Sequence, residues 1–155
     1  MKINLLKIQQ AEKSTDMGRI YAKIELIRTY DLAYVNDGSL SKDKVRRMDI
    51  DILVDTGADM LAINEHIKNQ LDLPVILIKE CRLADGSVLP LEIVGPVDIQ
   101  FGNRGTTTRA IVLPGNAEPL LGAIPLEDLD VVLLPKEQRM IPNPDSPYMA
   151  TTYLK

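Results

Sequence analysis

The segment Ile50–Leu61, IDILVDTGADML, limits the possible folds of this chain more than any other. Apolar residues recur at every second position over residues 48–54, which is the pattern of a strand with one apolar face. The strand then runs straight into Asp55, although strand interiors avoid Asp and an unpaired buried carboxylate is costly. Gly57 permits a sharp turn and a close approach of other groups, and Thr56 supplies a hydroxyl. The pattern predicts a carboxylate presented at the end of a strand.

Length and composition restrict the class of protein. A chain of 155 residues forms one ordinary domain and is too short for two large lobes. It has 22 acidic and 18 basic residues without a basic stripe carrying interleaved aromatics, so we do not expect a nucleic acid partner. Cys81 and His66 are the single cysteine and histidine, which disfavours an intrachain disulfide and a Cys/His zinc site. We expect neither a metal nor a cofactor.

The N-terminal residues MKINLLKIQQAEK contain a broken apolar run that lacks the apolar centre of a signal peptide. No apolar span of 18 residues occurs anywhere in the sequence, so no membrane partner is expected. These features, together with the single cysteine, predict a soluble, cytoplasmic protein.

Short apolar or alternating runs bounded by Gly, Pro, Asn and Asp favour an all-β fold. A turn is predicted at Asn36–Ser39, followed by a charged loop that leads into the strand before Asp55. Two antiparallel hairpins are predicted, one turning at Ala84–Ser87 and the other at Gly102–Gly105. The expected strands cover residues 3–8, 20–27, 48–54, 75–83, 88–94, 96–101, 106–113, the segment ending at 120–122, and 131–134.

Two short helices are expected. Asn64 can cap a helix over residues 65–71, and Pro125 suits the start of a single helical turn over residues 124–129. Three prolines within six residues begin at Pro142 and favour an extended arm or a partly ordered tail. The predicted organisation is therefore a domain of residues 1–141 and a Pro-rich arm of residues 142–155.

A triplet of Asp, Ser or Thr, and Gly arises by chance in roughly one chain in fifteen of this length, so its context matters. Here the context is LVDTGAD, the hairpin RLADGSVLPLEIVGPVDIQF and the later segment LLGAIPLEDLDVVL. Together these resemble the retropepsin family, the retroviral aspartic proteases and their relatives encoded by cells, over roughly residues 24–141. The resemblance implies a closed β-barrel subunit with a flap hairpin and one or two short helices.

The resemblance also implies roles for individual residues. Asp55 corresponds to the catalytic aspartate, Thr56 to the residue whose hydroxyl ties two active-site loops together, and Gly57 to the residue that lets them pack. Ala84, Asp85, Gly86 and Ser87 resemble the flap tip, and we expect these four residues, with Ala58 and Asp59, to contact substrate.

The sequence holds one Asp-Thr-Gly triplet, so the second carboxylate would have to come from a second copy of the chain. The implied enzyme is a homodimeric aspartic endopeptidase, with one Asp55 per subunit and a peptide or protein substrate. Val54, Ile63 and Ile111 are candidates for the walls of its cleft.

The sequence departs from the viral pattern in two places. Ala123 stands where viral enzymes usually carry an Arg that pairs with the residue at the position of Asp59. The flap tip has one glycine, Gly86, and the hairpin includes Pro90. An inactive retropepsin-fold module that dimerises or binds peptides is therefore an alternative.

Purely structural roles also fit several of these residues. Asp55 could simply accept backbone hydrogen bonds in a turn, and Cys81 fits a buried strand position better than a nucleophile. The charged run SKDKVRRMD favours a solvated loop that could also steer an acidic partner.

Overall fold

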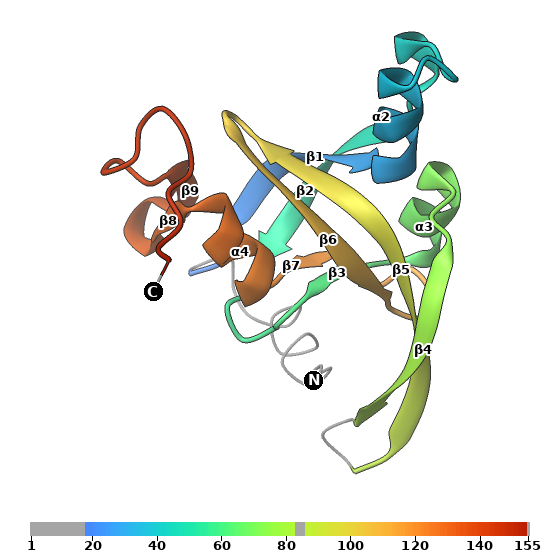
Figure 1. The fold of residues 1–155 in the computed structure, drawn as a ribbon. Helices are drawn as coiled ribbons and strands as arrows, with labels where there is room; N and C mark the ends of the chain where they lie inside the picture. The colour runs from blue at the N-terminus through green and yellow to red at the C-terminus, as the bar shows by residue number, and fades with distance from the viewer. Residues whose placement is uncertain (1–17, 83–85, 155) are drawn as a thin grey trace.

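The computed structural model describes residues 18–82 and 86–154, which are mainly β with three short α-helices. Seven strands form one sheet in the order β1-β2-β7-β3-β6-β5-β4, and β1 also pairs with β5. Six strands thereby close into a ring of hydrogen-bonded neighbours, with β4 outside it (Figure 1). The strands of this sheet are β1 (Tyr21–Arg28), β2 (Arg47–Val54), β3 (Leu61–Ile63), β4 (Val75–Arg82), β5 (Val88–Phe101), β6 (Arg104–Val112) and β7 (Leu120–Leu121).

Two apolar clusters stabilise the sheet. One is built on residues such as Leu26, Ile52 and Ile99, which are 0% exposed. The other lies where the β4–β5 hairpin meets β3 and β6, and includes Leu91 and Leu113. Burial of each such side chain contributes about 1.5–3 kcal/mol to the stability of the fold. The face of each strand that carries the alternating apolar residues therefore turns inward.

Both predicted helices form. Helix α3 (Glu65–Leu71) begins after Asn64, whose side-chain oxygen accepts a hydrogen bond from the Ile67 N–H at 3.0 Å. Ile67 and Leu71 are buried, as their four-residue spacing predicts. Helix α4 (Ala123–Leu129) starts one residue earlier than expected and buries Leu126 and Leu129. Among the described residues no helix is long and apolar enough to cross a bilayer.

Both predicted hairpins are confirmed. Strands β4 and β5 pair antiparallel up to Arg82 and Val88, while residues 83–85 at the turn lie outside the described ranges. The two strands predicted over 88–94 and 96–101 are one continuous strand, β5, with a register shift between Val94 and Val97. Residues 3–8, where a strand was predicted, also fall outside the described part of the chain.

One helix was not predicted. Helix α2 (Thr29–Asn36) and a short 3₁₀ helix (Lys42–Lys44) occupy the connection between β1 and β2, where the sequence indicated only a turn and a charged loop. The expected turn does follow α2, because Ser39 donates its N–H to the Tyr34 carbonyl at 2.8 Å. Asp31 is the one buried side chain of α2, so the helix lacks the apolar stripe by which a sequence usually reveals a helix.

The chain ends in a second, two-stranded sheet and a segment that returns to the ring. Strand β8 (Val131–Leu134) pairs antiparallel with β9 (Arg139–Pro142) across a 3₁₀ turn (Pro135–Glu137). Beyond β9, the side-chain amide of Asn103 donates to the carbonyls of Pro147 at 3.0 Å and Tyr148 at 3.2 Å. The proline-rich segment therefore lies against the β5–β6 turn.

Candidate functional site

Asp55 follows directly after β2 and is held there by backbone hydrogen bonds. Strand β2 pairs in parallel with β7, with Val54 opposite Leu121. The Asp55 N–H donates to the Leu121 carbonyl at 3.0 Å, and the Val54 N–H donates to the Ile20 carbonyl at 2.8 Å. The strand end is therefore fixed by contacts to two other segments, and it presents a half-buried carboxylate.

A tight turn fixes the orientation of this carboxylate. The Gly57 N–H donates to Asp55 Oδ1 at 2.9 Å, and the Ala58 N–H donates to the Asp55 carbonyl at 3.1 Å. Asp55 thus has the structural role expected of an Asp in a turn. Among the described residues, none donates a hydrogen bond to its other oxygen, Oδ2.

Gly122 lets a second segment cross the Asp55 loop at close range. A Cβ atom at this position would lie 2.4 Å from the Met60 carbonyl oxygen and 2.8 Å from that of Ala58. Two backbone hydrogen bonds hold the segments together at this crossing. The Ala123 N–H donates to the Ala58 carbonyl at 2.8 Å, and the Ile124 N–H donates to the Asp59 carbonyl at 2.9 Å. The space admits only a glycine at position 122. The two hydrogen bonds then fix the loop that carries Asp55 to the start of α4.

The structure brings some of the predicted site residues together. Asp55, Thr56, Gly57, Ala58 and Asp59 form one loop, in which Thr56, Gly57 and Asp59 are exposed and Ala58 is 7% exposed.

Gly86 and Ser87 are exposed and directly precede β5, the returning strand of the hairpin, whereas Ala84 and Asp85 lie outside the described residues. The hairpin projects from the ring of strands in Figure 1, and Ala58 of the Asp55 loop belongs to the same apolar cluster as Cys81 and Leu91 of the hairpin.

Two of the predicted wall residues are placed elsewhere. Ile63 is 0% exposed and Ile111 is 2% exposed, because β3 and β6 pair in the interior of the sheet and direct these side chains into the two cores. The prediction that they line a cleft is therefore wrong for this conformation. Val54, the residue next to Asp55, is half-buried and keeps part of its surface in solvent.

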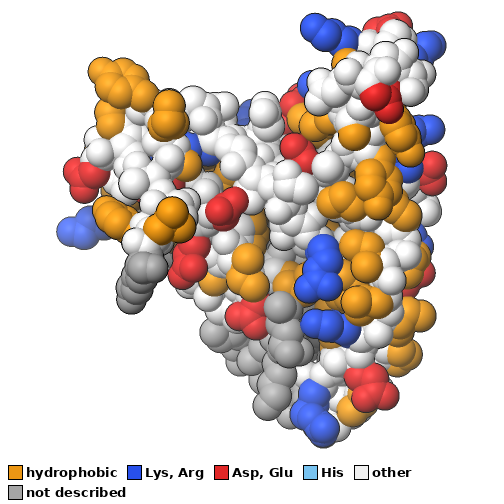
Figure 2. Space-filling model, in the orientation of Figure 1, with side chains coloured by type: hydrophobic (Ala, Val, Ile, Leu, Met, Phe, Trp, Pro, Cys, Tyr) orange, Lys and Arg blue, Asp and Glu red, His pale blue; other side chains and the backbone are white. Residues whose placement is uncertain are grey.

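The hairpin itself offers exposed apolar surface. Val75, Ile76, Ile78 and Val88 are each more than 40% exposed, and Figure 2 shows apolar side chains gathered along β4 and β5. Contiguous exposed apolar surface often marks a contact site for another molecule. The buried Cys81 in the same hairpin is 2% exposed, and burial raises the pKa of its thiol, so it suits packing rather than nucleophilic chemistry.

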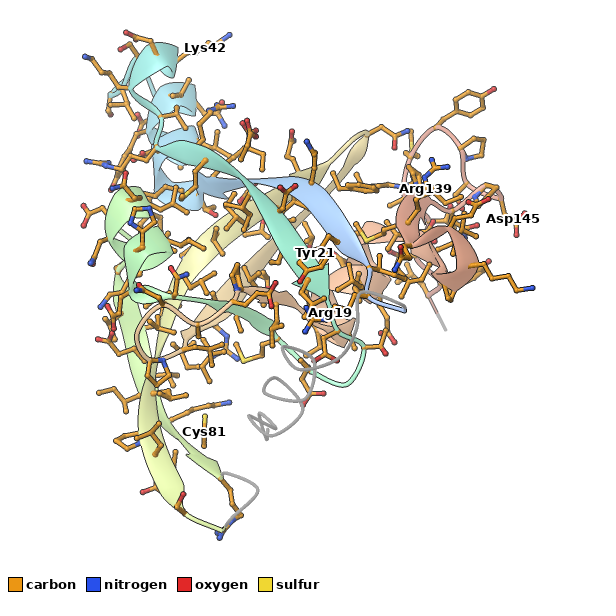
Figure 3. All side chains as sticks on the ribbon, turned by 180° about the vertical axis from the view of Figure 1, so that it is seen from behind. Arg19, Tyr21, Lys42, Cys81, Arg139 and Asp145 are labelled. Atoms are coloured by element: carbon orange, nitrogen blue, oxygen red, sulfur yellow. The ribbon has the colours of Figure 1, made fainter. Side chains whose placement is uncertain are left out.

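A polar cluster beside the strand end was not predicted from the sequence. The Tyr21 hydroxyl donates to Glu118 Oε1 at 2.7 Å and accepts a bond from Arg19 Nη1 at 3.4 Å (Figure 3). The hydrogen bond to Glu118, together with partial burial, raises the pKa of Tyr21. Glu118 is 97 positions from Tyr21, and no local pattern signals a contact over that separation.

Within the described ranges, no group of three or more His, Cys, Asp or Glu side chains is arranged to hold a metal ion.

Comparisons with known proteins do not identify a family. No protein-family profile matches the chain, and no curated protein matches it significantly. A functional interpretation therefore depends on the residues and their geometry.

Proposed function

We propose that this chain is one subunit of a homodimeric aspartic endopeptidase of the retropepsin type. One observation carries the proposal: the Asp-Thr-Gly loop is fixed against Gly122, whose backbone leaves no room for a Cβ, and it presents Asp55 with one carboxylate oxygen to which no described residue donates a hydrogen bond. A carboxylate that serves only a turn does not need a second segment fitted this closely against its loop. The ring of strands and the projecting hairpin are compatible with a closed-barrel subunit and a flap.

The chemistry needs two carboxylates. Hydrolysis of an amide requires a base that takes a proton from water and an acid that protonates the leaving nitrogen. Two aspartates held close together share one proton, as in aspartic proteases generally, because both cannot ionise at that distance. Since the sequence supplies one Asp-Thr-Gly triplet, two subunits would meet with their Asp55 loops on a two-fold axis.

The exposed side of the loop fits this arrangement. Thr56 and Gly57 are exposed in the single chain, which leaves them available to a facing subunit. In the dimer, the ionised Asp55 would take a proton from water as its oxygen attacks the carbonyl carbon. The protonated Asp55 of the other subunit would give its proton to the carbonyl oxygen, which forms a tetrahedral diol. On collapse, the C–N bond breaks, the Asp55 that took the proton from water gives it to the leaving nitrogen, and the other Asp55 regains a proton from one hydroxyl of the diol. The pair would titrate as one unit.

The proposed substrate is an extended peptide or an unfolded protein segment. Such a segment would lie between the Asp55 loops and the two β4–β5 hairpins. It would be bound mainly through main-chain hydrogen bonds, and apolar pockets of the dimer would select among substrate side chains. The apolar surface along the hairpin supports a substrate that contains apolar residues. The proposed setting is the cytoplasm, with no cofactor.

Asp55→Asn tests the proposal, since asparagine keeps the hydrogen-bond acceptor for Gly57 but cannot ionise. Against a diverse peptide library between about pH 3 and pH 7, we expect kcat/KM to fall about 10²–10⁴-fold. Asp49→Asn is the matched control, because it removes the charge of an exposed aspartate on the same strand, and it should leave activity within about twofold. Cleavage that survives in Asp55→Asn, or none by the unmodified protein, contradicts the proposal.

The alternative, an inactive module of the same fold, gives a different result in this assay. Peptides would then bind to the unmodified dimer without being cut, and Asp55→Asn would not change their affinity by more than a few-fold.

A further inference from the structure

The connection between β1 and β2 forms a separate feature that the proposed reaction does not use. We call residues 29–46 the projecting unit. It consists of α2 and the short 3₁₀ helix, and it stands away from the ring of strands (Figure 1). Antiparallel strands such as β1 and β2 can be joined by a two-residue turn, so this connection is much longer than their pairing requires.

A hollow of about 370 Å³ lies between α2 and the segment leading into β2. Leu32, Val35 and Val45 form its apolar lining, and Asn36, Lys42 and Arg47 supply its polar groups. The volume falls in the range of small binding sites, which typically combine an apolar surface with a few polar groups that fix orientation. The hollow suits one apolar side chain with negative charges on either side.

The charged groups that line the hollow are basic, since Lys42 and Arg47 line it and no Asp or Glu does. Residues 42–47, KDKVRR, carry four basic groups and one acidic group, whereas the whole chain has a net charge of −4. No described carboxylate lies within ion-pair distance of Lys42, which is exposed at the outer end of the unit (Figure 3). Arg47 makes only a loose contact with Glu25, at 3.4 Å, and its side chain is 46% exposed.

The unit is held in place before any ligand arrives. Asp31 is 1% exposed, and its Oδ1 lies 2.8 Å from Arg28 Nη1. Its Oδ2 accepts the Arg46 N–H at 2.9 Å, which ties α2 to the segment 42–47. Arg28 Nε also donates to the Asp72 carbonyl at 3.0 Å and so links the unit to the end of α3. A hollow fixed in this way loses little conformational freedom on binding.

We propose that the hollow is a docking site for an acidic peptide segment. The segment inserts an apolar side chain between α2 and residues 42–47, and its flanking carboxylates pair with Lys42 and Arg47. A peptide fits better than a nucleic acid, because the lining is aliphatic and contains no aromatic ring on which bases could stack. The proposal uses no residue of the Asp55 loop and does not depend on the proposed peptidase activity.

The first experiment selects ligands from a display library of random ten-residue peptides. The bait carries Asp55→Asn, so that bound peptides are not cut. We expect enrichment of sequences with an apolar residue flanked by Asp or Glu. The same selection on a bait that also carries Lys42→Gln and Arg47→Gln should lose this enrichment, whereas peptides bound at the Asp55 loop would be retained.

The second experiment measures affinity for one selected, fluorescein-labelled peptide by anisotropy. Lys42→Gln with Arg47→Gln should weaken peptide binding about tenfold. Val35→Asp should weaken it equally, because it places a negative charge in the hollow that repels the carboxylates of the peptide. Circular dichroism should show that the Val35→Asp protein remains folded. Lys136→Gln with Arg139→Gln is the matched control. It removes one Lys and one Arg from another exposed turn, where Arg139 is 3.8 Å from Glu137, and it should change affinity less than twofold.

Three results would overturn the inference. The first is a selection in which peptides with an apolar residue flanked by Asp or Glu are not enriched. The second is an enrichment or a peptide affinity that is the same in the Lys42→Gln/Arg47→Gln protein. The third is binding of a ten-nucleotide single-stranded DNA as tight as that of the selected peptide. A Lys42→Gln/Arg47→Gln variant that keeps Asp55 should cleave a short neutral peptide at the same rate as the unmodified protein. This readout separates a failure at the hollow from a failure at Asp55.

Discussion

Asp31 and Asp55 are both held close to β1 and β2, yet the chain treats their carboxylates in opposite ways. Asp31 is 1% exposed, and both of its oxygens are engaged by Arg28 and Arg46. Asp55 is half-buried, receives one N–H on Oδ1 and is held in place by the backbone of its loop. The first carboxylate holds segments of the fold together, and the second is positioned by the fold, with one oxygen that accepts no hydrogen bond from the described residues. Loss of Asp31 should therefore affect stability, and loss of Asp55 should affect chemistry.

The largest difference is expected on removal of the charge at each position. Asp31→Asn should lower the free energy of unfolding by about 3 kcal/mol, because two arginines lose a buried ionic partner. Asp55→Asn should change it by less than about 1 kcal/mol, since the asparagine oxygen still accepts from Gly57. Chemical denaturation of the two variants and of the unmodified protein measures both changes in the free energy of unfolding. Equal losses would show that Asp55 is only structural.

A smaller effect tests the support of the Asp55 loop. Gly122→Ala should destabilise the protein by about 1–3 kcal/mol, because the new methyl group would collide with backbone atoms of residues 58–60. Gly105→Ala is the control, since its nearest neighbour would be 3.8 Å away. Thermal unfolding compares the two variants. If Gly122→Ala matches the control in stability and keeps full peptidase activity, the close crossing does not position Asp55.

The smallest expected effect is on the acid limb of stability. Burial alone would raise the pKa of Asp31, but the hydrogen bonds from Arg46 and Arg28 and their charges bring it below its ordinary value. Because the pKa is lower in the folded chain, this stabilisation is present above about pH 4, the ordinary pKa of Asp, and is lost as the pH falls toward the folded value.

Unfolding free energies measured from about pH 6 to pH 3 should therefore fall less steeply in Asp31→Asn than in the unmodified protein. Identical slopes would contradict the ionic role assigned to Asp31. Asp37 and Asp130 also have lowered pKa values, from hydrogen bonds with Ser39 and Asn143, and they contribute equally to both proteins.

The same two regions show what local sequence can predict. Helix α3 was predicted with its correct bounds, because its cap at Asn64 and its apolar pair lie within eight residues of one another. Helix α2 was missed, because it has no apolar stripe and its buried Asp31 is held in part by Arg46, 15 positions away in the sequence. A cap and an apolar pair within eight residues can be read from the sequence, whereas a partner 15 positions away that the fold brings into contact cannot.

The candidate site shows the same division. The triplet at 55–57, the strand before it and the Leu120–Gly122 segment were visible as patterns, and the structure places them side by side. The depth of Ile63 and Ile111 was not visible, since it depends on β3 pairing in parallel with β6, a choice that alternation alone does not specify. The hydrogen bond between Tyr21 and Glu118 was likewise hidden by its separation in sequence.

Mixing subunits tests most directly whether two copies of Asp55 form one site. Unmodified protein is combined with Asp55→Asn protein, the subunits are allowed to exchange, and peptide cleavage is measured against the fraction of unmodified chain at constant total concentration. If each active site needs a carboxylate from both subunits, activity follows the square of that fraction, so an equal mixture retains about one quarter of the full rate. A linear dependence, with about one half of the rate retained, would show that a single chain carries the complete chemistry and would contradict the account.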